Sequence, residues 1–224
     1  MNAKELLAKG LNELGFACSG EQLNAFMTFL FELKKWNRAY NLTALKTDKD
    51  IIIKHFLDSI LYLKVISINT VRKTAPPVLS PGIKLADMGT GAGFPAIPIK
   101  IISPATDITL VESSRKKTAF LRHIIRVLKL EEVNILNKRV EDLGEDHEKT
   151  YDVIVSRATF KVKDFMKKAC PYVKENGRLI LSKGPKSIEE IKGLKKEGII
   201  KKIIRLPFIN IERTLLVIKC EKEP

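Results

Sequence analysis

The 224-residue chain is predicted to be an α/β protein: a mainly parallel sheet with helices on both faces, preceded by a small helical N-terminal extension. Three observations support this fold. From residue 83 onward, short apolar runs typical of buried strands alternate with helical segments. A turn with alternating glycines joins the first of these strands to the next helix. Residues 1–66, in contrast, have their apolar side chains at helical spacing.

The N-terminal extension is predicted to contain two main helices. Ser19 and Gln22 have the spacing of a capping box, and apolar residues follow them at helical intervals. A second helix is expected to begin after Asp48 or Asp50 and to bury Ile53, Phe56, Leu57 and Ile60. We expect the two apolar stripes to give the extension a small core of its own. The resulting division is an extension at 1–73, a proline-rich linker at 74–82 and a main domain at 83–224.

The most informative stretch runs from Asp87 to Pro95, directly after the apolar strand Ile83 to Met88. Its glycines occupy every second position, which allows positive φ and lets a ligand approach closely. A dinucleotide-binding turn would place its third glycine at position 94, where the chain has Phe94. The spacing therefore resembles the S-adenosylmethionine loop of Rossmann-like methyltransferases more than an NAD loop. Another nucleotide loop or a purely structural turn stays open on this stretch alone.

The strands that follow are expected to end at one edge of the sheet, where α/β folds bind ligands. The first is a run from Ile108 that ends in Glu112, after which Ser113 or Ser114 caps a helix. Glu112 can accept hydrogen bonds from ribose hydroxyls, or it can favour the positive end of that helix. The later runs are expected at 133–136, 151–156, 178–182, 199–206 and 214–219, with a turn at 176–177, a helix at 188–197 and an antiparallel final pair.

Charge points to a polyanionic partner, because 40 Lys and Arg residues against 26 Asp and Glu residues give a net charge of +14. Basic residues concentrate between Arg115 and Arg139 and between Lys183 and Arg205. A solvated helix face would explain either cluster equally well. No run is long enough to span a membrane and no secretory leader is recognisable, so the protein is expected in the cytoplasm. The three scattered cysteines and three scattered histidines indicate neither a disulfide framework nor a metal site.

One set of polar residues on the second predicted helix shares a face opposite its apolar stripe: His55, Asp58, Ser59 and Tyr62. One interpretation directs this face toward a methyl donor or an RNA. The other is an ordinary pair between His55 and Asp58, with further hydrogen bonds that hold the extension to the main domain.

Six motifs in order connect the chain to a known family: W-N-x-x-Y-N-L-T at 36–43, H-x-L-D-S at 55–59, D-x-G-x-G-A-G-F-P at 87–95, R-V-E at 139–141, S-R-A at 156–158 and L-x-K-G at 181–184. The chain resembles, over essentially its whole length, the glucose-inhibited division protein B family. These are bacterial methyltransferases that act on guanine N7 of 16S rRNA. The resemblance implies a class I methyltransferase fold, S-adenosylmethionine as the donor, and a 16S rRNA guanine near the decoding centre as the acceptor.

The resemblance also implies site residues. Those carried over for the donor are Gly89, Phe94, Val140, Glu141 and Arg157. The glycine loop and the strand end add Gly91 and Glu112 to the expected donor site. The substrate is expected to be 16S rRNA or the small ribosomal subunit, and the enzyme is expected to be a monomer that uses no metal. Met88 stands where Ile or Val is commoner in the family pattern, which is a change that a core tolerates.

Methylation at guanine N7 uses an in-plane lone pair and removes no proton, so the reaction requires no general base. The chain has no Asp/Asn-Pro-Pro-aromatic quartet, and Cys170-Pro171 reverses the order of a Pro-Cys nucleophile. The base must still leave its stack, so aromatic or amide groups are expected beside it. The candidates for holding it are Asn41 and His55, and those for contacting RNA are Tyr40, Lys116, Arg122, Arg126 and Lys183.

Two other functions stay possible on the sequence. A small-molecule methyltransferase would share the glycine loop and Glu112 but would not need a charge of +14. A non-catalytic RNA-binding module would keep the charge and would not bind the donor. An NAD-dependent enzyme is disfavoured by Phe94 and by the missing second nucleotide-binding half.

Overall fold

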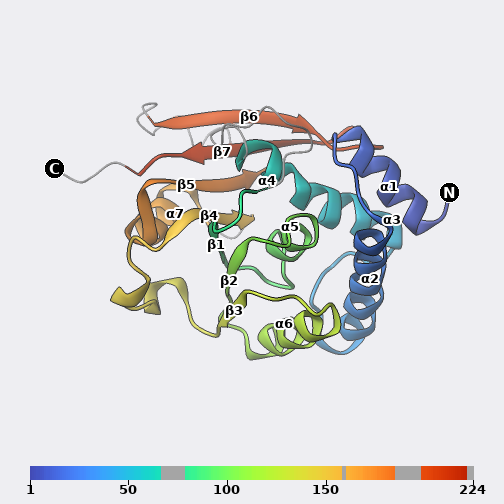
Figure 1. The fold of residues 1–224 in the computed structure, drawn as a ribbon, viewed down its shortest axis with the longest axis horizontal. Helices are drawn as coiled ribbons and strands as arrows, with labels where there is room; N and C mark the ends of the chain where they lie inside the picture. The colour runs from blue at the N-terminus through green and yellow to red at the C-terminus, as the bar shows by residue number, and fades with distance from the viewer. Residues whose placement is uncertain (67–78, 158–159, 185–197, 221–224) are drawn as a thin grey trace.

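The computed structural model describes residues 1–66, 79–157, 160–184 and 198–220, and these residues form an α/β fold (Figure 1). Seven strands make one sheet in the order β3-β2-β1-β4-β5-β7-β6. Their bounds are β1 Lys84–Met88, β2 Asp107–Val111, β3 Val133–Leu136, β4 Tyr151–Arg157, β5 Val173–Lys183, β6 Ile199–Arg205 and β7 Glu212–Ile218. The first five strands are parallel, and β7 lies antiparallel between β5 and β6, which confirms the predicted final pair.

Helices cover both faces of this sheet, as predicted. Along β4, Val153 and Val155 belong to a core packed under the N-terminal helices and α5, whereas Ile154 points into a second core with Phe165 of α7. The helix bounds are α1 Ala3–Glu13, α2 Gly20–Tyr40, α3 Asp48–Ile51, α4 Asp58–Ile66, α5 Ala96–Ile102, α6 Arg115–Val127 and α7 Val162–Ala169. Between α3 and α4 the chain continues as one turn of π-helix, Ile52–Leu57 (η1).

Capping boxes begin the first two helices. Ser19 accepts the backbone N–H of Gln22 at the start of α2, and the Gln22 side chain accepts the N–H of Ser19, as the sequence predicts. Helix α1, which the sequence pattern did not predict as a separate helix, has the same arrangement between Asn2 and Glu5. The predicted second helix begins at Asp48, with Thr47 as its cap.

The N-terminal helices do not have a core of their own, so that expectation is wrong. Phe26 and Phe56 belong to the same buried cluster as Leu85, Ile108 and Ile180 of the sheet. The helices of the extension therefore serve as the covering layer of one sheet face. The predicted linker begins within residues 74–78, which lie outside the described residues, as does the helix predicted at 188–197.

The turn expected at residues 176–177 is also absent. Strand β5 begins at Val173 and continues through Gly177, so it is longer than predicted. Tyr151 pairs with Val173 while Val153 pairs with Arg178, so β5 contains an irregularity at this point. A turn-forming pair of residues is thus accommodated as a bulge within a strand.

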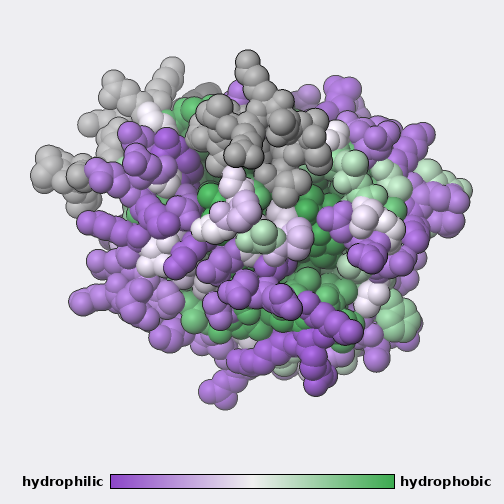
Figure 2. All heavy atoms as spheres, viewed as in Figure 1, coloured by the Kyte–Doolittle hydropathy of each residue, from purple (hydrophilic) through white to green (hydrophobic). Residues whose placement is uncertain are grey.

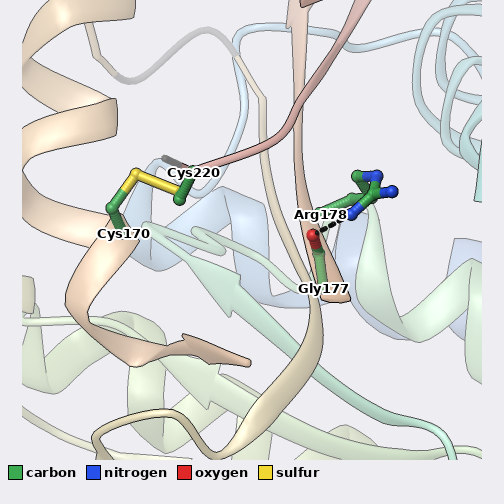
Figure 3. Close-up of a disulfide and its surroundings, with 4 residues drawn as sticks. All are labelled: Cys170, Gly177, Arg178 and Cys220. Carbon is green, nitrogen blue, oxygen red and sulfur yellow. Dashed lines mark hydrogen bonds between the residues drawn. A yellow bond between two sulfur atoms is a disulfide. The ribbon is translucent and has the colours of Figure 1, made fainter. Parts of the chain in front are cut away.

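The structure contains a disulfide that the scattered cysteines did not predict. Cys170, directly after α7, is bonded to Cys220, two residues after the end of β7 (Figure 3). The two residues are 50 positions apart in the chain, and their Cα atoms are 5.6 Å apart. Sequence spacing carries no signal for such a pair, because the fold alone brings the ends of α7 and β7 together.

Candidate functional site

The carboxyl ends of the parallel strands bring most of the predicted site residues to one edge of the sheet. Gly89 follows β1, Glu112 follows β2, Val140 lies four residues after β3, Arg157 ends β4 and Lys183 ends β5. Strand β1 is flanked by β2 and β4, so the strand order reverses beside it. This is the position at which open α/β sheets bind ligands.

The glycine loop has the backbone that its spacing predicts. Gly89, Gly91 and Gly93 have φ values of 75°, 63° and 94°, a region that residues with a Cβ rarely adopt. A Cβ on Gly93 would lie 2.5 Å from Ile97 Cγ1, whereas a Cβ on Gly91 would meet nothing within 4 Å. Gly93 is therefore required for packing against α5, and Gly91 faces open space. Pro95 precedes α5 by one residue and forms its N-terminal cap.

The carboxylate of Asp87 holds this loop from inside. Asp87 is fully buried, and its Oδ2 accepts hydrogen bonds from Thr90 Oγ1 (2.7 Å) and from the Ala96 N–H (3.1 Å). Burial raises the pKa of Asp87 to about 7. Its Oδ1 is a buried oxygen without a hydrogen-bond partner among the described residues. Asp87 thus fixes the entry to α5 and leaves one buried acceptor.

Glu112 connects the glycine loop to the start of α6. Its Oε2 accepts the Gly91 N–H and its Oε1 accepts the Ser114 N–H, both at 2.9 Å. Ser114 is the cap of α6, so the helix-terminus interpretation of Glu112 has direct support. The Lys117 ammonium lies 3.9 Å from Oε2. Since an ionised carboxylate offers about four acceptor positions, the two bonds leave capacity for a ligand.

Val140 and Glu141 form a short 3-10 turn, Val140–Asp142 (η3), beside α7. Val140 is buried in the core under α7, while Glu141 pairs with Lys168. Tyr172, which follows the disulfide cysteine, donates its hydroxyl to the Leu143 carbonyl at 3.0 Å. The turn is therefore held in place from the side of α7.

Phe94 lies inside a cluster of rings and is almost fully buried. The ring of His55 stacks on it with centroids 4.4 Å apart, and the ring of Phe29 lies 5.2 Å from it. The Arg157 guanidinium lies 5.1 Å from the same ring. The Phe94 side chain thus joins the glycine loop to the N-terminal helices, and only its backbone is available to line a donor site.

His55 is a neutral side chain in this cluster. Burial lowers the pKa of His55 to about 3, and the charge of Arg157 adds to the effect. Its Nε2 lies 2.7 Å from Thr43 Oγ1. Its Nδ1 is buried without a hydrogen-bond partner among the described residues. His55 is therefore suited to positioning a group and not to proton transfer near neutral pH.

The predicted polar face of the second helix is buried and holds the extension to the sheet. Asp58 accepts a hydrogen bond from Arg213 Nε (2.8 Å) and lies 3.6 Å from Arg157 Nη1. Tyr62 donates to the Ser156 carbonyl at 2.7 Å. The predicted partner of Asp58 was His55, and this is wrong because His55 instead bonds with Thr43. The structural interpretation of the face is confirmed with different partners.

The loop after α2 has an internal framework of its own. Asn37 Nδ2 donates to the Thr43 carbonyl (2.9 Å), and the Thr43 N–H donates to Asn37 Oδ1 (2.8 Å). Asn41 ends α2 in the left-handed region, with φ 49° and ψ 53°, and its side chain is exposed. Asn37 and Thr43 were not among the predicted site residues. The signal that could have indicated them is the amide-rich motif at 36–43, which has the composition of a helix C-terminus.

The predicted RNA contacts divide into exposed and buried residues. Tyr40, Lys116, Arg122 and Arg126 are exposed. In Figure 2 hydrophilic side chains gather over α6, which lies at the lower margin of the view. Lys183, in contrast, is 9% exposed and donates its ammonium to the Phe160 carbonyl. The structure therefore separates Lys183 from the open basic surface.

Among the described residues, no helix is both long and apolar enough to cross a membrane. No group of three or more His, Cys, Asp or Glu residues within the same ranges has an arrangement that could hold a metal ion.

Comparison with known proteins identifies the family. The family model described as "GidB: rRNA small subunit methyltransferase G" matches residues 22–216. Ribosomal RNA small subunit methyltransferase G of Geobacter sp. (strain M21) is 39% identical over 87% of this chain and 83% of that protein. The protein of the same name from Alkaliphilus oremlandii (strain OhILAs) is 36% identical over 100% and 92%. A crystal structure of a SAM-dependent methyltransferase from Aquifex aeolicus shares the fold, with a TM-score of 0.56, 16% identity and coverage of 76% and 93%. The chain therefore belongs to the rRNA small subunit methyltransferase G family, and it has the class I methyltransferase fold.

Proposed function

We propose that this protein transfers a methyl group from S-adenosylmethionine to N7 of a guanine in 16S rRNA. The observation that carries the proposal is the glycine loop at the carboxyl edge of the sheet, held by Asp87 and Glu112, in a chain of this family. The polynucleotide is either free 16S rRNA or the small ribosomal subunit, and the protein acts as a monomer in the bacterial cytoplasm, where ribosomes are assembled.

The residues at the loop fit this donor. Open space in front of Gly91 admits a ligand close to the backbone, and the carboxylate of Glu112 retains lone pairs for ribose hydroxyls. The donor is a cation at its sulfonium, and the acidic groups nearest the loop are Asp87 and Glu112. We assign the donor contacts to Gly89, Gly91, the Phe94 backbone, Glu112, Val140 and Glu141. Arg157 then acts by holding Phe94 and Asp58 in place.

The reaction requires little of the protein beyond correct placement of the donor and the guanine. S-adenosylmethionine, when bound, supplies an electrophilic methyl group. Guanine N7 has an in-plane lone pair and loses no proton on methylation, so the protein needs no base, which is consistent with a neutral His55. The remaining roles of the side chains are to hold the guanine ring in position and to exclude water.

Base placement is assigned to the loop after α2. Thr43 connects this loop to His55, and His55 stacks on Phe94 directly after the glycine loop. Asn41 is exposed at the end of α2, where its amide can reach a base edge. The basic face of α6, with Lys116, Arg122 and Arg126, is assigned to phosphate contacts.

Two experiments test the proposal together. Calorimetry with S-adenosylmethionine measures donor binding by the purified chain. Methylation with labelled donor, on rRNA from a strain lacking this gene, is then mapped by N7-specific strand cleavage. Donor binding and one labelled guanine are the expected results. Donor binding with no labelled rRNA would favour a small-molecule methyltransferase, and RNA binding without donor binding would favour a non-catalytic RNA-binding module.

A further inference from the structure

A groove lies between the end of α2 and the loop that leads to α3. It encloses about 660 Å³ and is lined by Lys34, Asn37, Arg38, Asn41, Thr43, Ala44, Leu45 and Lys46. The α2 residues among these recur at intervals of three and four positions, so they share one helix face. The groove is hydrophilic on the helix side and is open to solvent.

Two cations of the groove are not used by the fold. Lys34 pairs with Asp48, so its charge is compensated. Arg38 and Lys46 are exposed, and neither makes an ion pair within the described part of the chain. The groove therefore carries net positive charge next to three uncharged polar side chains, Asn37, Asn41 and Thr43.

A path of side-chain contacts connects the groove to the glycine loop. Thr43, which lines the groove, lies 2.7 Å from His55 Nε2 through its hydroxyl. The opposite contact of His55 is the ring of Phe94, 4.4 Å away, and Phe94 directly follows Gly93. The groove and the candidate donor site are therefore linked through His55 and Phe94.

Aromatic rings connect the groove to the basic face of α6. Tyr40 directly precedes Asn41, which lines the groove; it is 44% exposed, and its ring lies 5.4 Å from that of Trp36. Trp36 in turn lies 4.9 Å from the ring of His123, on α6 between Arg122 and Arg126. Helices α2 and α6 adjoin along this line (Figure 1). Ring contacts thus run from α6, with its exposed Arg122 and Arg126, to the end of α2, where the groove begins.

We infer that this groove binds a single-stranded stretch of the RNA substrate, directly beside the target base. Arg38 and Lys46 contact phosphates, and Tyr40 offers a ring for a flanking base, which is the combination that single-stranded nucleic acids require. The inference rests on the proposed function for the nature of the polymer. It adds a path for the RNA strand, which runs from α6 over Tyr40 into the groove and ends at the glycine loop.

The test compares two variants that change charge equally. Arg38→Glu with Lys46→Glu alters the groove, and Lys163→Glu with Lys167→Glu alters exposed positions on α7, on the other face of the sheet. Binding of a fluorescent single-stranded RNA oligonucleotide is measured by anisotropy over a range of salt concentrations. The groove variant is expected to lose at least about 10-fold in affinity, and its log–log salt slope is expected to fall by about 1.4, or about 0.7 for each lost phosphate contact. The α7 variant should keep the wild-type slope.

A second pair of variants tests the ring. Tyr40→Ala is expected to weaken oligonucleotide binding by about 10-fold, and Tyr40→Phe, which keeps the ring, to leave it unchanged. Thermal unfolding and calorimetry with S-adenosylmethionine confirm for each variant that the fold and donor binding are intact. Equal salt slopes for the groove and α7 variants would overturn the inference while leaving the proposed function standing. Absence of salt-dependent RNA binding by the unaltered chain would instead overturn the proposed function.

Discussion

The glycine loop and the loop after α2 flank the candidate site and are built in opposite ways. The glycine loop is supported from its inner side by two acidic residues, since Asp87 is fully buried and Glu112 is nearly so. Its backbone is fixed by carboxylates that accept N–H groups of Gly91 and Ala96. The loop after α2 is open, and the charges that line its groove are mostly cationic. Its backbone is fixed by an amide, Asn37, and not by a charged group.

The difference assigns each loop to one of two partners. A loop supported by acidic residues suits a small cation, which the proposed donor is, whereas a basic, open groove suits a polyanion. The two loops meet at His55, which contacts Thr43 on one side and Phe94 on the other. Changes in one loop should therefore affect one binding constant and leave the other intact, which can be measured.

The largest effect is expected from Gly89→Val. A β-branched residue resists a φ of 75°, so the backbone of the loop would have to change. Donor binding should fall by at least about 100-fold, while RNA binding should be unchanged. Gly15→Val is a matched control, since Gly15 has a φ of 82° between α1 and α2 and nothing within 4 Å of an added Cβ. Equal donor affinity for both variants would show that Gly89 does not belong to the donor site.

Charge reversal on α6 should have the next largest effect and should act on RNA alone. Replacing Lys116, Arg122 and Arg126 with Glu is expected to lower the log–log salt slope of RNA binding by roughly 0.7–0.9 for each lost phosphate contact. Donor affinity should stay the same. Reversal of three exposed lysines near α7, Lys161, Lys163 and Lys167, controls for net charge. A salt slope identical to that of this control would show that the α6 cluster is a solvated helix face and does not contact RNA.

Glu112→Gln should weaken donor binding by about 1–2 kcal/mol, or roughly 5- to 30-fold. The amide keeps the size and one acceptor but loses the charge-assisted hydrogen bonds with the Gly91 and Ser114 N–H groups. Calorimetry with the donor provides the measurement, and the exposed Glu13→Gln is the control. If the unfolding free energy changes and donor affinity does not, the role of Glu112 is only to stabilise the N-terminus of α6.

The pH dependence of stability should distinguish the buried acid from the buried imidazole. Asp87, with a pKa of about 7 in the folded chain, holds a proton between pH 3.8 and 7 that the unfolded chain has released. Its contribution to the unfolding free energy therefore falls as pH rises through this window, by at most about 1.4 kcal/mol per pH unit. His55, with a folded pKa of about 3, acts in the opposite direction between pH 3 and 6.5.

Asp87→Asn isolates the acid. The stability of the wild type minus that of the variant should decrease as pH rises from 4 to 7, as measured by urea unfolding at each pH. Asp164→Asn, at an exposed position on α7, should give a constant difference. A difference for Asp87→Asn that is constant or that rises with pH would contradict the raised pKa.

The smallest binding effect is expected at Asn41. Asn41→Gly removes the amide and keeps the left-handed backbone, so both binding constants should be nearly intact while the methylation rate falls. Asn41→Ala should show the same rate loss together with about 1 kcal/mol of lost stability, because alanine disfavours a φ of 49°. An unchanged methylation rate in Asn41→Gly would restrict Asn41 to ending the helix.

The glycine loop and the polar face of α4 differ in how well the sequence predicts them. The glycine loop depends on local backbone geometry, so its spacing predicts the strand, the positive φ values and the following helix. The polar face of α4, in contrast, depends on contacts between distant side chains. Asp58 and Arg213 are 155 positions apart, and Tyr62 and Ser156 are 94 apart. Helical periodicity places Asp58 and Tyr62 on one face but cannot identify their partners.

Other wrong predictions from the sequence have the same physical origin. The shared core could not be predicted because apolar periodicity shows which side of a helix is buried, not which element covers it. Asn176 and Gly177 favour a turn locally, yet pairing with β4 keeps them in a strand with a bulge. Lys183 belongs to a basic cluster in the sequence but bonds with the Phe160 carbonyl in the fold.

The disulfide changes the connectivity of the polypeptide itself. Cys170 and Cys220 close a covalent ring that contains β5, β6 and β7, three neighbouring strands of the sheet. A protease that cuts one peptide bond between the two cysteines opens this ring without releasing a fragment. The two pieces would therefore migrate as one molecule under denaturing conditions and separate only after reduction.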